Sequence, residues 1–556
     1  MGIYLNPGKE SYEEAVNSEI FVDKTEMIRF LNTIVRTKQK FVCISRPRRF
    51  GKTMAADMIC AYYDREADSR AMFEKLNLAN NCKHYYNKQA WDIYLEKFEV
   101  LRFVITDFMG GCNSVSEMLQ NLTDEISEDI LEKYPEIKSD KQLNLRSILN
   151  KIYGKTKRQF VIVIDEWDAV FRIWKNNKEE YTKYLDFLRN LLKDRPYVAL
   201  AYMTGILPIK KYGQHSALNM FDEYSMLYPR QLAEFTGFTE KEVKDLCNRF
   251  GRDFDEVKAW HDGYKVSGIR PSDPDYKMLK ETGSSPKPES FELYSPLSVV
   301  QTIITGFIKN YWNKTETYEA LAEYIRRDYD GLKETIAILM DGGKIKVDTS
   351  TYQNDMVTFT SKDDVLSLLI HLGYLGFYDE TSEVFVPNKE ILDEFKTSTK
   401  SSEWLSTFES FELSQKLLKA TWEMNSDKVA ELLEKAHNKV ENKTYNDEAA
   451  LSYAVQYAYY ASQKYYTTIL ELDSGKGYAD IVYLPSPQYS DKPALLIELK
   501  YNKEVDGAIS QIKKQNYPER LEHYKGNILL IGINYNKDIP SNNPDFKHHS
   551  CIIEKA

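Results

Sequence analysis

The sequence has little of what marks secreted, membrane-spanning or zinc-binding proteins. Its six cysteines are scattered over 556 residues with no C-x-x-C pair, which argues against a zinc ribbon or disulfide framework and is typical of a reducing compartment. No run approaches the roughly 18 apolar residues that a membrane span requires. The first residues, MGIYLNPGKESYEE, lack the charged-then-apolar pattern of a signal peptide. We therefore expect a cytoplasmic protein without a membrane partner.

A net positive charge is also absent. The chain has 74 Lys and Arg against 84 Asp and Glu, a formal net charge of −10. It is therefore not a uniformly basic nucleic-acid coat, and any nucleic-acid surface must be a local patch, such as the arginines of residues 46–49 or the lysines after residue 499. The composition is that of an ordinary globular protein, and the length is too great for one core, so we expect several domains.

Short apolar runs alternate with helical stretches through the first 235 residues. These runs are apolar nearly throughout, which is typical of parallel strands covered by helices on both faces. The stretch 114–134 has helical spacing. This part of the chain is predicted to be α/β, with strands at residues 40–45, 100–108, 159–166 and 197–205.

The rest of the chain changes its pattern twice. Residues 236–330 are predicted to be helical, beginning with a capping box formed by Thr239 and Glu242, except for a stretch rich in Pro, Gly and Ser at 267–290 that is predicted to be loop or disorder. Residues 363–391 predict a helix and then a hairpin turning near 380–382, which suggests a small winged-helix-like module. After a linker at 397–403 and further helices, strands are predicted at 466–473, 478–485, 494–501 and 527–535, with a helix at 505–524 between the last two.

A loop with the ending of a phosphate-binding motif follows the first predicted strand. The segment SRPRRFGKT (residues 45–53) ends like G-x-x-x-x-G-K-[ST], but Arg46 stands where the first glycine is expected. Strand, loop and helix are the context that this motif needs. Backbone N–H groups from Gly51 onward would hold phosphate oxygens, Lys52 would reach the β- and γ-phosphates, and the Thr53 hydroxyl would bind Mg2+.

Two further strand ends support a nucleotide site. FVIVIDEWD ends in carboxylates: Asp165 would hold Mg2+ through water and Glu166 would orient the attacking water. Thr204 ends the next apolar strand and could sense the γ-phosphate. A chance GKT, with acidic residues that merely solvate a strand end, is the alternative; the combination of motif and context favours ATP with Mg2+.

These motifs together resemble a known family. RPRRFGKT, with FVDKT (21–25), IDEWD (164–168) and TGI (204–206), resembles the AAA-ATPase-like proteins often fused to a PD-(D/E)XK nuclease. The resemblance extends over nearly the whole chain through WHDGY, LGYL and VPNKE. It implies ATP binding and hydrolysis, and it makes Arg46 a usual feature of the loop.

The other residues of this loop are also candidates. Arg48, Arg49 and Phe50 are counted with Arg46 as candidate nucleotide-binding residues. For the two arginines, contact with phosphate and a bland role, capping a helix or contacting another domain, remain equally open.

A second constellation lies near the C-terminus. Asp480 is on one predicted strand, and Glu498 and Lys500 are two residues apart on the next, so the latter two share a face. This D…E-x-K pattern is that of metal-dependent phosphodiester cleavage: both carboxylates would bind Mg2+ or Mn2+, and Lys500 would orient or activate the attacking water. The alternative is that these charges merely alternate along a solvent-exposed strand. The run ALLIELKY is mostly apolar, however, and burying unpaired charges in such a strand is energetically costly, which favours a functional role.

The resemblance to the nuclease family adds further candidates. It implies a short mixed sheet flanked by helices. It also implies that Glu448, on the preceding helix, is a metal ligand, and that Gln511 and Tyr517, on the helix after the E-x-K strand, contact phosphate or substrate.

The sequence thus predicts an α/β protein with four parts. They are an AAA-like P-loop ATPase domain (1–235), a helical lid (236–330), a winged-helix-like connector (331–396) and a PD-(D/E)XK nuclease-like α/β domain (397–556). The predicted function is ATP hydrolysis coupled to metal-dependent cleavage of nucleic acid, DNA more readily than RNA, within a possible homo-oligomer. The rival hypothesis is a nucleotide-controlled binding module for nucleic acid or protein, in which the nuclease-like domain does not cleave. A third is an active nuclease on an inactive ATPase.

Overall fold

The computed structural model describes most of the chain in two compact units. The first unit comprises Met1–Leu332 and Ile345–Ser398, and the second comprises Lys333–Lys344 and Thr399–Ala556. The residues described are 2–80, 90–137, 143–174, 178–209, 218–269, 288–312, 331–352, 359, 361–399, 402–437, 448–473, 478–503, 506–514, 524, 526–539 and 547–556. Within these ranges no helix is long and apolar enough to cross a membrane.

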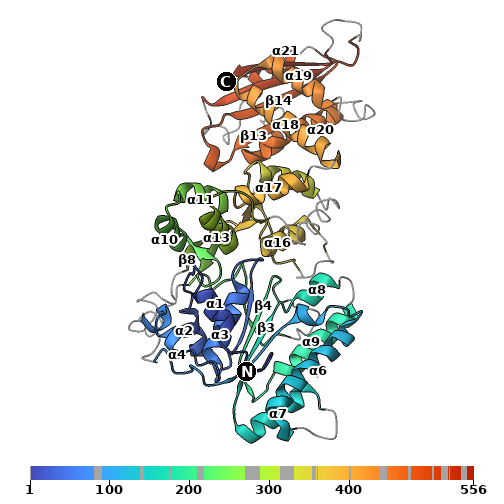
Figure 1. Cartoon of the computed structure of the whole chain (residues 1–556). Coiled ribbons are helices and arrows are strands. Elements are labelled where there is room, and N and C mark those ends of the chain that lie inside the picture. Colours follow the sequence, from blue (N-terminus) through green and yellow to red (C-terminus); the bar gives the residue numbers. More distant parts are fainter. Residues whose placement is uncertain are drawn as a thin grey trace, which may run out of the picture. The chain divides into compact units, whose positions relative to one another are not determined.

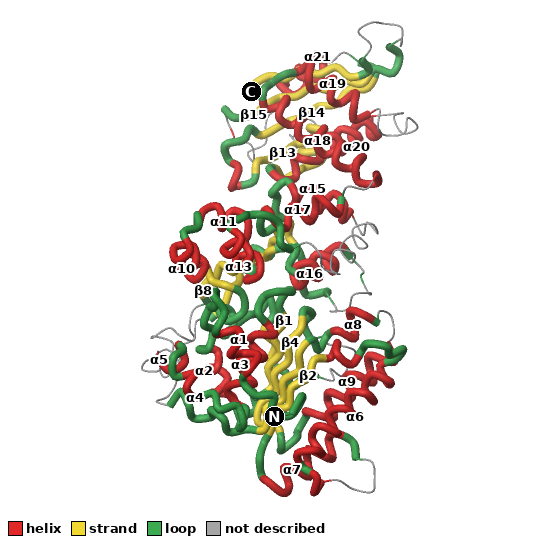
Figure 2. Tube along the Cα trace, in the orientation of Figure 1, coloured by secondary structure: helices red, strands yellow, loops and turns green. Residues whose placement is uncertain are grey.

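A parallel five-stranded sheet forms the centre of the first unit. Its strand order is β2-β3-β4-β1-β5, and every neighbouring pair is parallel. Figures 1 and 2 show α1, α2 and α3 on one side of the sheet and α6 and α9 on the other. The strands are β1 (Phe41–Ser45), β2 (Glu99–Val104), β3 (Phe160–Asp165), β4 (Val198–Gly205) and β5 (Asp222–Tyr224).

The four apolar runs are confirmed as strands, with two differences. Residues 105–108 form a short 3-10 helix rather than the end of β2. β5 was not predicted, because three residues with one buried side chain give no usable pattern. The helices of this part are α1 (Glu10–Val16), α2 (Met27–Ile34), α3 (Lys52–Tyr63), α4 (Arg70–Phe73), α5 (Asn77–Asn80), α6 (Val115–Lys133), α7 (Leu145–Thr156), α8 (Ala169–Ile173) and α9 (Lys178–Leu192).

The region 236–330 is not wholly helical, which corrects the prediction. It contains a small antiparallel sheet of order β6-β8-β7. In β7, buried and partly exposed residues alternate over only five positions, too few to stand out from a helical background. The predicted capping box at Thr239 and Glu242 is confirmed. The elements are β6 (Phe238–Thr239), α10 (Glu240–Phe250), α11 (Phe254–His261), β7 (Tyr264–Gly268), β8 (Glu289–Tyr294) and α13 (Pro296–Thr305).

The predicted helix and hairpin complete the first unit. β10 and β11 pair antiparallel across the turn that was expected near residues 380–382, and β9 adds a third strand beside β11. The elements are β9 (Ile345–Lys346), α16 (Lys362–Leu372), β10 (Gly376–Tyr378), β11 (Glu383–Phe385) and α17 (Lys389–Ser398).

The second unit is built on a mixed sheet of order β12-β13-β14-β15-β16. Only the β14–β15 pair is parallel. Residues of α18, α19 and α20 fill the core on one face, and Ile509 of α21 packs on the other. The elements are α15 (Leu332–Met340), α18 (Ser402–Trp422), α19 (Ser426–His437), α20 (Glu448–Ala458), β12 (Tyr466–Asp473), β13 (Tyr478–Pro485), β14 (Ala494–Tyr501), α21 (Asp506–Lys514), β15 (Ile528–Tyr535) and β16 (His549–Lys555).

The predicted C-terminal strands are confirmed, and the structure adds a fifth strand that was not predicted. His549 begins β16, which pairs with β15 from Tyr535 to Leu529. This segment forms a strand because it pairs with β15, which lies earlier in the chain. The residues of the segment alone show no pattern that would predict this pairing.

A buried carboxylate joins three elements of the first unit. Glu390 of α17 accepts hydrogen bonds from the backbone N–H groups of Tyr311 (2.6 Å) and Trp312 (2.9 Å). It also accepts from Ser298 Oγ of α13 (3.1 Å), and its Oε2 lies 3.1 Å from His261 Nδ1 of α11. A buried carboxylate with several donors fixes how these elements pack.

We expect Glu390→Ala to destabilise the first unit strongly. The substitution leaves several buried donors without their acceptor, so the free energy of unfolding should fall by about 3–5 kcal/mol. Glu380→Ala, at an exposed position of the hairpin, is the control and should change it by less than about 0.5 kcal/mol. Urea denaturation of the two variants measures this, and equal midpoints would contradict the role of Glu390.

Candidate functional site

The loop between β1 and α3 has the geometry of a phosphate-binding loop. Gly51 precedes α3 with a φ of +82°, a left-handed conformation that favours glycine. The first N–H groups of α3 have no partner within the helix and can bind an anion. Lys52 is buried, and its Nζ donates to the carbonyls of Arg46 (3.1 Å) and Pro47 (2.8 Å) of the same loop. A phosphate would compete with these carbonyls for the ammonium group.

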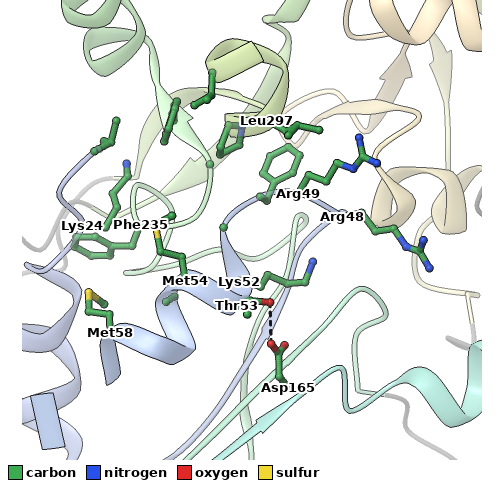
Figure 3. Close-up of a pocket in the computed structure, with 18 of the residues that line it drawn as sticks. Lys24, Arg48, Arg49, Lys52, Thr53, Met54, Met58, Asp165, Phe235 and Leu297 are labelled. Carbon is green, nitrogen blue, oxygen red and sulfur yellow. Dashed lines mark hydrogen bonds between the residues drawn. The ribbon is translucent and has the colours of Figure 1, made fainter. Parts of the chain in front are cut away.

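Asp165, at the end of β3, connects the loop to two strands. It is 1% exposed. Its Oδ2 accepts a hydrogen bond from Thr53 Oγ1 (2.8 Å), as Figure 3 shows. Its Oδ1 accepts from Thr204 Oγ1 and from the Glu166 backbone N–H (3.0 Å). Three predicted site residues, from α3, β3 and β4, are thus brought into direct contact.

The turn after β3 carries a second group of charges. Glu166 has a φ of +51°, and its Oε2 accepts from Arg172 Nη2 (3.2 Å). Arg172 Nε donates to Asp168 Oδ2 (3.1 Å). The same Asp168 oxygen accepts the backbone N–H groups of Ile206 (3.1 Å) and Leu207 (2.9 Å), which follow β4. Asp168 therefore fixes both the turn and the end of β4.

A cavity of about 760 Å³ lies against these residues, with a polar part and an apolar part. In Figure 3, Met54, Met58 and Phe235 lie to one side of Lys52 and Thr53, and Arg48 and Arg49 lie to the other. The apolar part is also lined by Tyr12, Ile20, Phe21, Val22, Phe238, Leu297 and Val300. The polar part includes Lys52, Thr53, Asp165, Glu166 and Arg172.

The structure distinguishes the arginines of the loop. Arg46 is fully buried, donates from Nη1 to the carbonyls of Ser45 (3.1 Å) and Tyr224 (3.0 Å), and does not line the cavity. Burial lowers the pKa of its guanidinium to about 10. Arg48 and Arg49 line the cavity, and Arg49 Nη1 also donates to the Tyr311 carbonyl (2.9 Å). The contact of Arg49 with another part of the unit matches the bland alternative.

Phe50 forms part of the cavity wall while its own side chain is buried. Its ring packs edge-on against the ring of Tyr264, with centroids 5.3 Å apart. Its carbonyl accepts the Gly237 N–H (3.0 Å). Phe50 thus ties the loop to the region that follows the sheet.

Burial shifts the charge state of Lys52. Desolvation lowers the pKa of its ammonium to about 8, although the nearby carboxylate of Asp165 opposes this shift. An anion bound in the cavity would raise that pKa again, because it stabilises the protonated form.

The carboxylates of the C-terminal unit also meet on one face of their sheet. Glu498 is 2% exposed, and its Oε1 accepts from Lys500 Nζ at 2.8 Å. β13 pairs with β14 up to Ile481 and Ile497, so the same alternation places Asp480 opposite Glu498. Asp480 Oδ2 accepts the Leu499 N–H (2.7 Å). The two carboxylates and the lysine therefore lie together.

Three other residues were predicted for this site. Glu448 is the first residue of α20 and Gln511 lies in α21, but their side chains, like the whole of Tyr517, lie outside the described residues. Among the side chains that are described, no group of three or more His, Cys, Asp or Glu could hold a metal ion. The hard oxygen donors of Asp480 and Glu498 nevertheless suit Mg2+ or Mn2+ in kind.

Sequence reasoning missed three polar residues at these sites. Arg172 and Asp168 lie beyond the recognised DE pair, and only their i,i+4 spacing hints at a pairing. Asn534 is buried on β15 in register with Lys500, and its Oδ1 accepts the Lys503 N–H (3.2 Å). Its position depends on strand register, which the sequence alone does not reveal.

Comparison with protein families agrees with this geometry. Residues 8–214 match the family described as predicted AAA-ATPase, and residues 446–540 match the PD-(D/E)XK nuclease superfamily. One chain carries both an AAA-ATPase-like domain and a PD-(D/E)XK superfamily domain. The P-loop, Asp165 and Thr204 lie in the AAA-ATPase-like domain, and Asp480, Glu498 and Lys500 lie in the PD-(D/E)XK domain.

Individual relatives are more distant. A protein of Azotobacter chroococcum mcd 1, "Uncharacterized protein in vnfD 5'region", is 26% identical over 294 residues, which are 51% of this chain and 52% of that protein. The chain therefore spans about half the length of this relative. Two structures of the Aeropyrum pernix ORC2 protein, in ADPNP–ADP complexes and in an ADP form, are 12% and 11% identical, with TM-scores of 0.28 and 0.27. They cover 68% and 70% of this chain and 96% and 97% of their own chains.

We expect Gly205→Ala to disturb the AAA-ATPase-like domain. An added Cβ would lie 2.7 Å from the Trp167 ring and 2.8 Å from Asp168 Oδ1, so packed groups must shift at a cost of about 1–3 kcal/mol. Gly154→Ala in α7, where a Cβ meets nothing within 4 Å, is the matched control. It should stabilise by about 0.5–1 kcal/mol through helix propensity. Thermal unfolding compares the two, and equal shifts would refute the packing argument.

Proposed function

We propose that this chain is an ATP-hydrolysing P-loop ATPase joined to a metal-dependent nuclease. The observation that carries the ATPase half is the direct contact of Thr53, Thr204 and Asp165 beside Lys52, at the wall of a cavity large enough for a nucleotide. Family matches at both ends of the chain support the combination of two activities.

The cavity divides in a way that suits ATP. The apolar part, with Met58 and Phe235, would take the base, while the polar part would take the phosphates. Lys52 and the first N–H groups of α3 would bind phosphate oxygens. Thr53 and Asp165 would hold Mg2+, which screens the phosphate charge when it is bound. In this proposal Arg48 contacts phosphate from the cavity rim, and Arg49 does so through the guanidinium nitrogens other than the Nη1 that donates to the Tyr311 carbonyl. Thr204, which donates to Asp165, would respond to the γ-phosphate through that carboxylate.

Hydrolysis would then use Glu166. Water attacks the γ-phosphorus, the bond to the β–γ bridging oxygen breaks, and ADP and phosphate form. Glu166 orients the water and accepts its proton. Its side chain is 43% exposed, so it can adjust to the bound substrate.

In the C-terminal domain, Asp480 and Glu498 would hold Mg2+ or Mn2+. The metal, when bound, stabilises charge on the phosphodiester during cleavage. Lys500 orients the attacking water, and one P–O bond is exchanged for another. Glu448 as a further ligand, and Gln511 and Tyr517 as substrate contacts, are part of this proposal by resemblance. DNA is the proposed substrate in preference to RNA, in the cytoplasm, with assembly into a homo-oligomer.

One observation favours a second candidate function. Glu498 already has a cationic partner within the protein, because Lys500 Nζ donates to it at 2.8 Å. A domain that binds nucleic acid without cutting it, under control of the ATP site, would need no more than this. In that case ATP would drive association with nucleic acid or with a partner protein.

ATP affinity should depend on the charge of Lys52. With a pKa near 8 in the free site, Lys52 is protonated at lower pH and loses its proton as pH rises through that value. Affinity should therefore be constant near about pH 7 and fall by up to about tenfold per pH unit above about pH 8. Titration with a fluorescent ATP analogue and Mg2+ measures this.

Two variants provide the controls for Lys52. Lys52→Arg keeps its charge across this range and should give weaker binding without the decline. Lys52→Ala should lower affinity at every pH. The same decline in Lys52→Arg as in the wild type would assign the titration to another group.

Nuclease activity tests the C-terminal half of the proposal. Wild type should cut plasmid or single-stranded DNA with Mn2+, and Glu498→Gln should reduce the rate by at least about 100-fold, because a neutral amide is a poor ligand for a hard cation. Glu554→Gln is the matched control: Glu554 lies on β16 of the same sheet, and losing its exposed ion pair with Lys513 of α21 should leave cutting unchanged.

The pattern of results separates the alternatives. Cutting that persists in Glu498→Gln would refute the assignment of this site. ATP-dependent binding of DNA without cutting would establish the binding module instead. Cutting that ignores Lys52→Ala would show a nuclease independent of the ATP site.

A further inference from the structure

Arg172 lines the cavity, and a hydrogen bond to a buried carboxylate holds its side chain in place. Its side chain is 9% exposed and lines the cavity together with Lys52 and Thr53. Its Nε is held by Asp168, which is completely buried and anchored by two backbone N–H groups beyond β4. Its Nη2 is directed to Glu166. One end of the guanidinium is thus fixed to the fold, while the other contacts a side chain that is free to move.

Two cations share this part of the cavity. The positive charge of Arg172 lowers the pKa of Lys52, in addition to the larger effect of burial, so the two groups are close enough to repel. At Lys52 the attraction of Asp165, and that of Asp168, each outweigh this repulsion, and Glu166 adds to them. An anion with several oxygens, such as a terminal phosphate, could bind both cations at once.

We propose that Arg172 provides, from within the same chain, the arginine that contacts the γ-phosphate, and that its bond to Glu166 withholds this acid until ATP is bound. This role rests on the proposed ATPase function. When the γ-phosphate arrives, Nη2 exchanges the Glu166 carboxylate for phosphate oxygens, and Glu166 is released to orient the water. ADP has no γ-phosphate, so Arg172 remains with Glu166.

The local geometry suits this exchange. The left-handed backbone of Glu166 is fixed by its N–H bond to Asp165, so only the side chain has to move. The Nε–Asp168 bond can persist throughout, because Nε and Nη2 are separate donors of one rigid group. Arg172 would then stabilise the charge on the γ-phosphoryl group while the bond to the β–γ bridging oxygen breaks, with the water proton passing to Glu166.

A purely structural role is the alternative to this proposal. Arg172 could serve only to hold α8 and the turn after β3 in place. Such a role would change stability, and it would change ATP and ADP binding to the same extent. The proposed role instead affects kcat and the preference for ATP over ADP.

The test compares Arg172→Ala and Arg172→Lys with wild type and Arg70→Ala. Arg70 forms an exposed ion pair with Asp92 and does not line the cavity, so its variant should retain wild-type turnover. We expect Arg172→Ala to lower kcat by at least about 100-fold, as intrachain and supplied arginines do in other NTPases. Its ADP affinity should stay within about threefold of wild type, and its preference for ATP over ADP should be lost.

Two further readouts distinguish chemistry from structure. Added guanidinium ion should restore part of kcat in Arg172→Ala and should not affect Arg70→Ala. Arg172→Lys, which keeps the charge but loses the forked donors, should lie between wild type and alanine. Equal loss of ATP and ADP affinity, or a kcat within about threefold of wild type, would overturn the proposal.

The outcomes also distinguish a failure of the proposed role of Arg172 from a failure of the proposed ATPase function. If wild type hydrolyses ATP and Glu166→Gln does not, the proposed function stands and the Arg172 variants decide the inference. If wild type neither binds nor hydrolyses ATP, the proposed function fails and the role of Arg172 fails with it.

Discussion

The buried carboxylate of Asp165 is the constraint on which the N-terminal site depends. A carboxylate that is nearly without solvent is tolerable only when several donors satisfy it. Here the donors come from Thr53 of α3, Thr204 of β4 and the backbone of Glu166. The phosphate loop, the acidic strand end and the neighbouring strand are therefore held in register by contacts within the protein. Such preorganisation lowers the cost of ordering the site when a ligand binds.

The polar contacts around Asp165 and Asp168 leave Glu166 as the carboxylate of this turn that can move. Asp168 is committed to the fold, since it accepts two backbone N–H groups and the Nε of Arg172. Asp165 is committed to its three donors. Of the three, Glu166 has the exposed side chain, and it accepts from Arg172. The three neighbouring carboxylates around the turn after β3 thus differ in how many hydrogen-bond donors contact them. This difference determines which of them is held by the fold and which can move.

Features that depend on neighbouring residues could be predicted from the sequence, and features that depend on contacts between distant residues could not. Apolar runs predicted β1 to β4 and β12 to β15. The signal is strongest for β1, β3, β4 and β15, because these strands are buried along their whole length and so consist mostly of consecutive apolar residues. β5, β7 and β16 were missed because their position depends on pairing with distant strands, which leaves little local pattern. Spacing brought out Lys52, Thr53 and the carboxylates, since those contacts recur with fixed geometry. It could not show that Arg46 turns into the core or that Arg172 faces the cavity, because both depend on packing between elements far apart in the chain.

The two sites share one electrostatic arrangement. In each, a carboxylate expected to act in catalysis is paired with a cation a few residues along the chain: Glu166 with Arg172 at 3.2 Å and Glu498 with Lys500 at 2.8 Å. For Glu498 the pair is nearly buried, and desolvation makes such pairs poor stabilisers compared with apolar residues of similar size. Stability alone therefore does not account for a Glu and a Lys in the otherwise apolar β14. A functional need for charge at that position would account for the Glu and the Lys. A charged ligand could take the place of one of the two residues as partner of the other, so that neither charge is left unpaired in the protein interior.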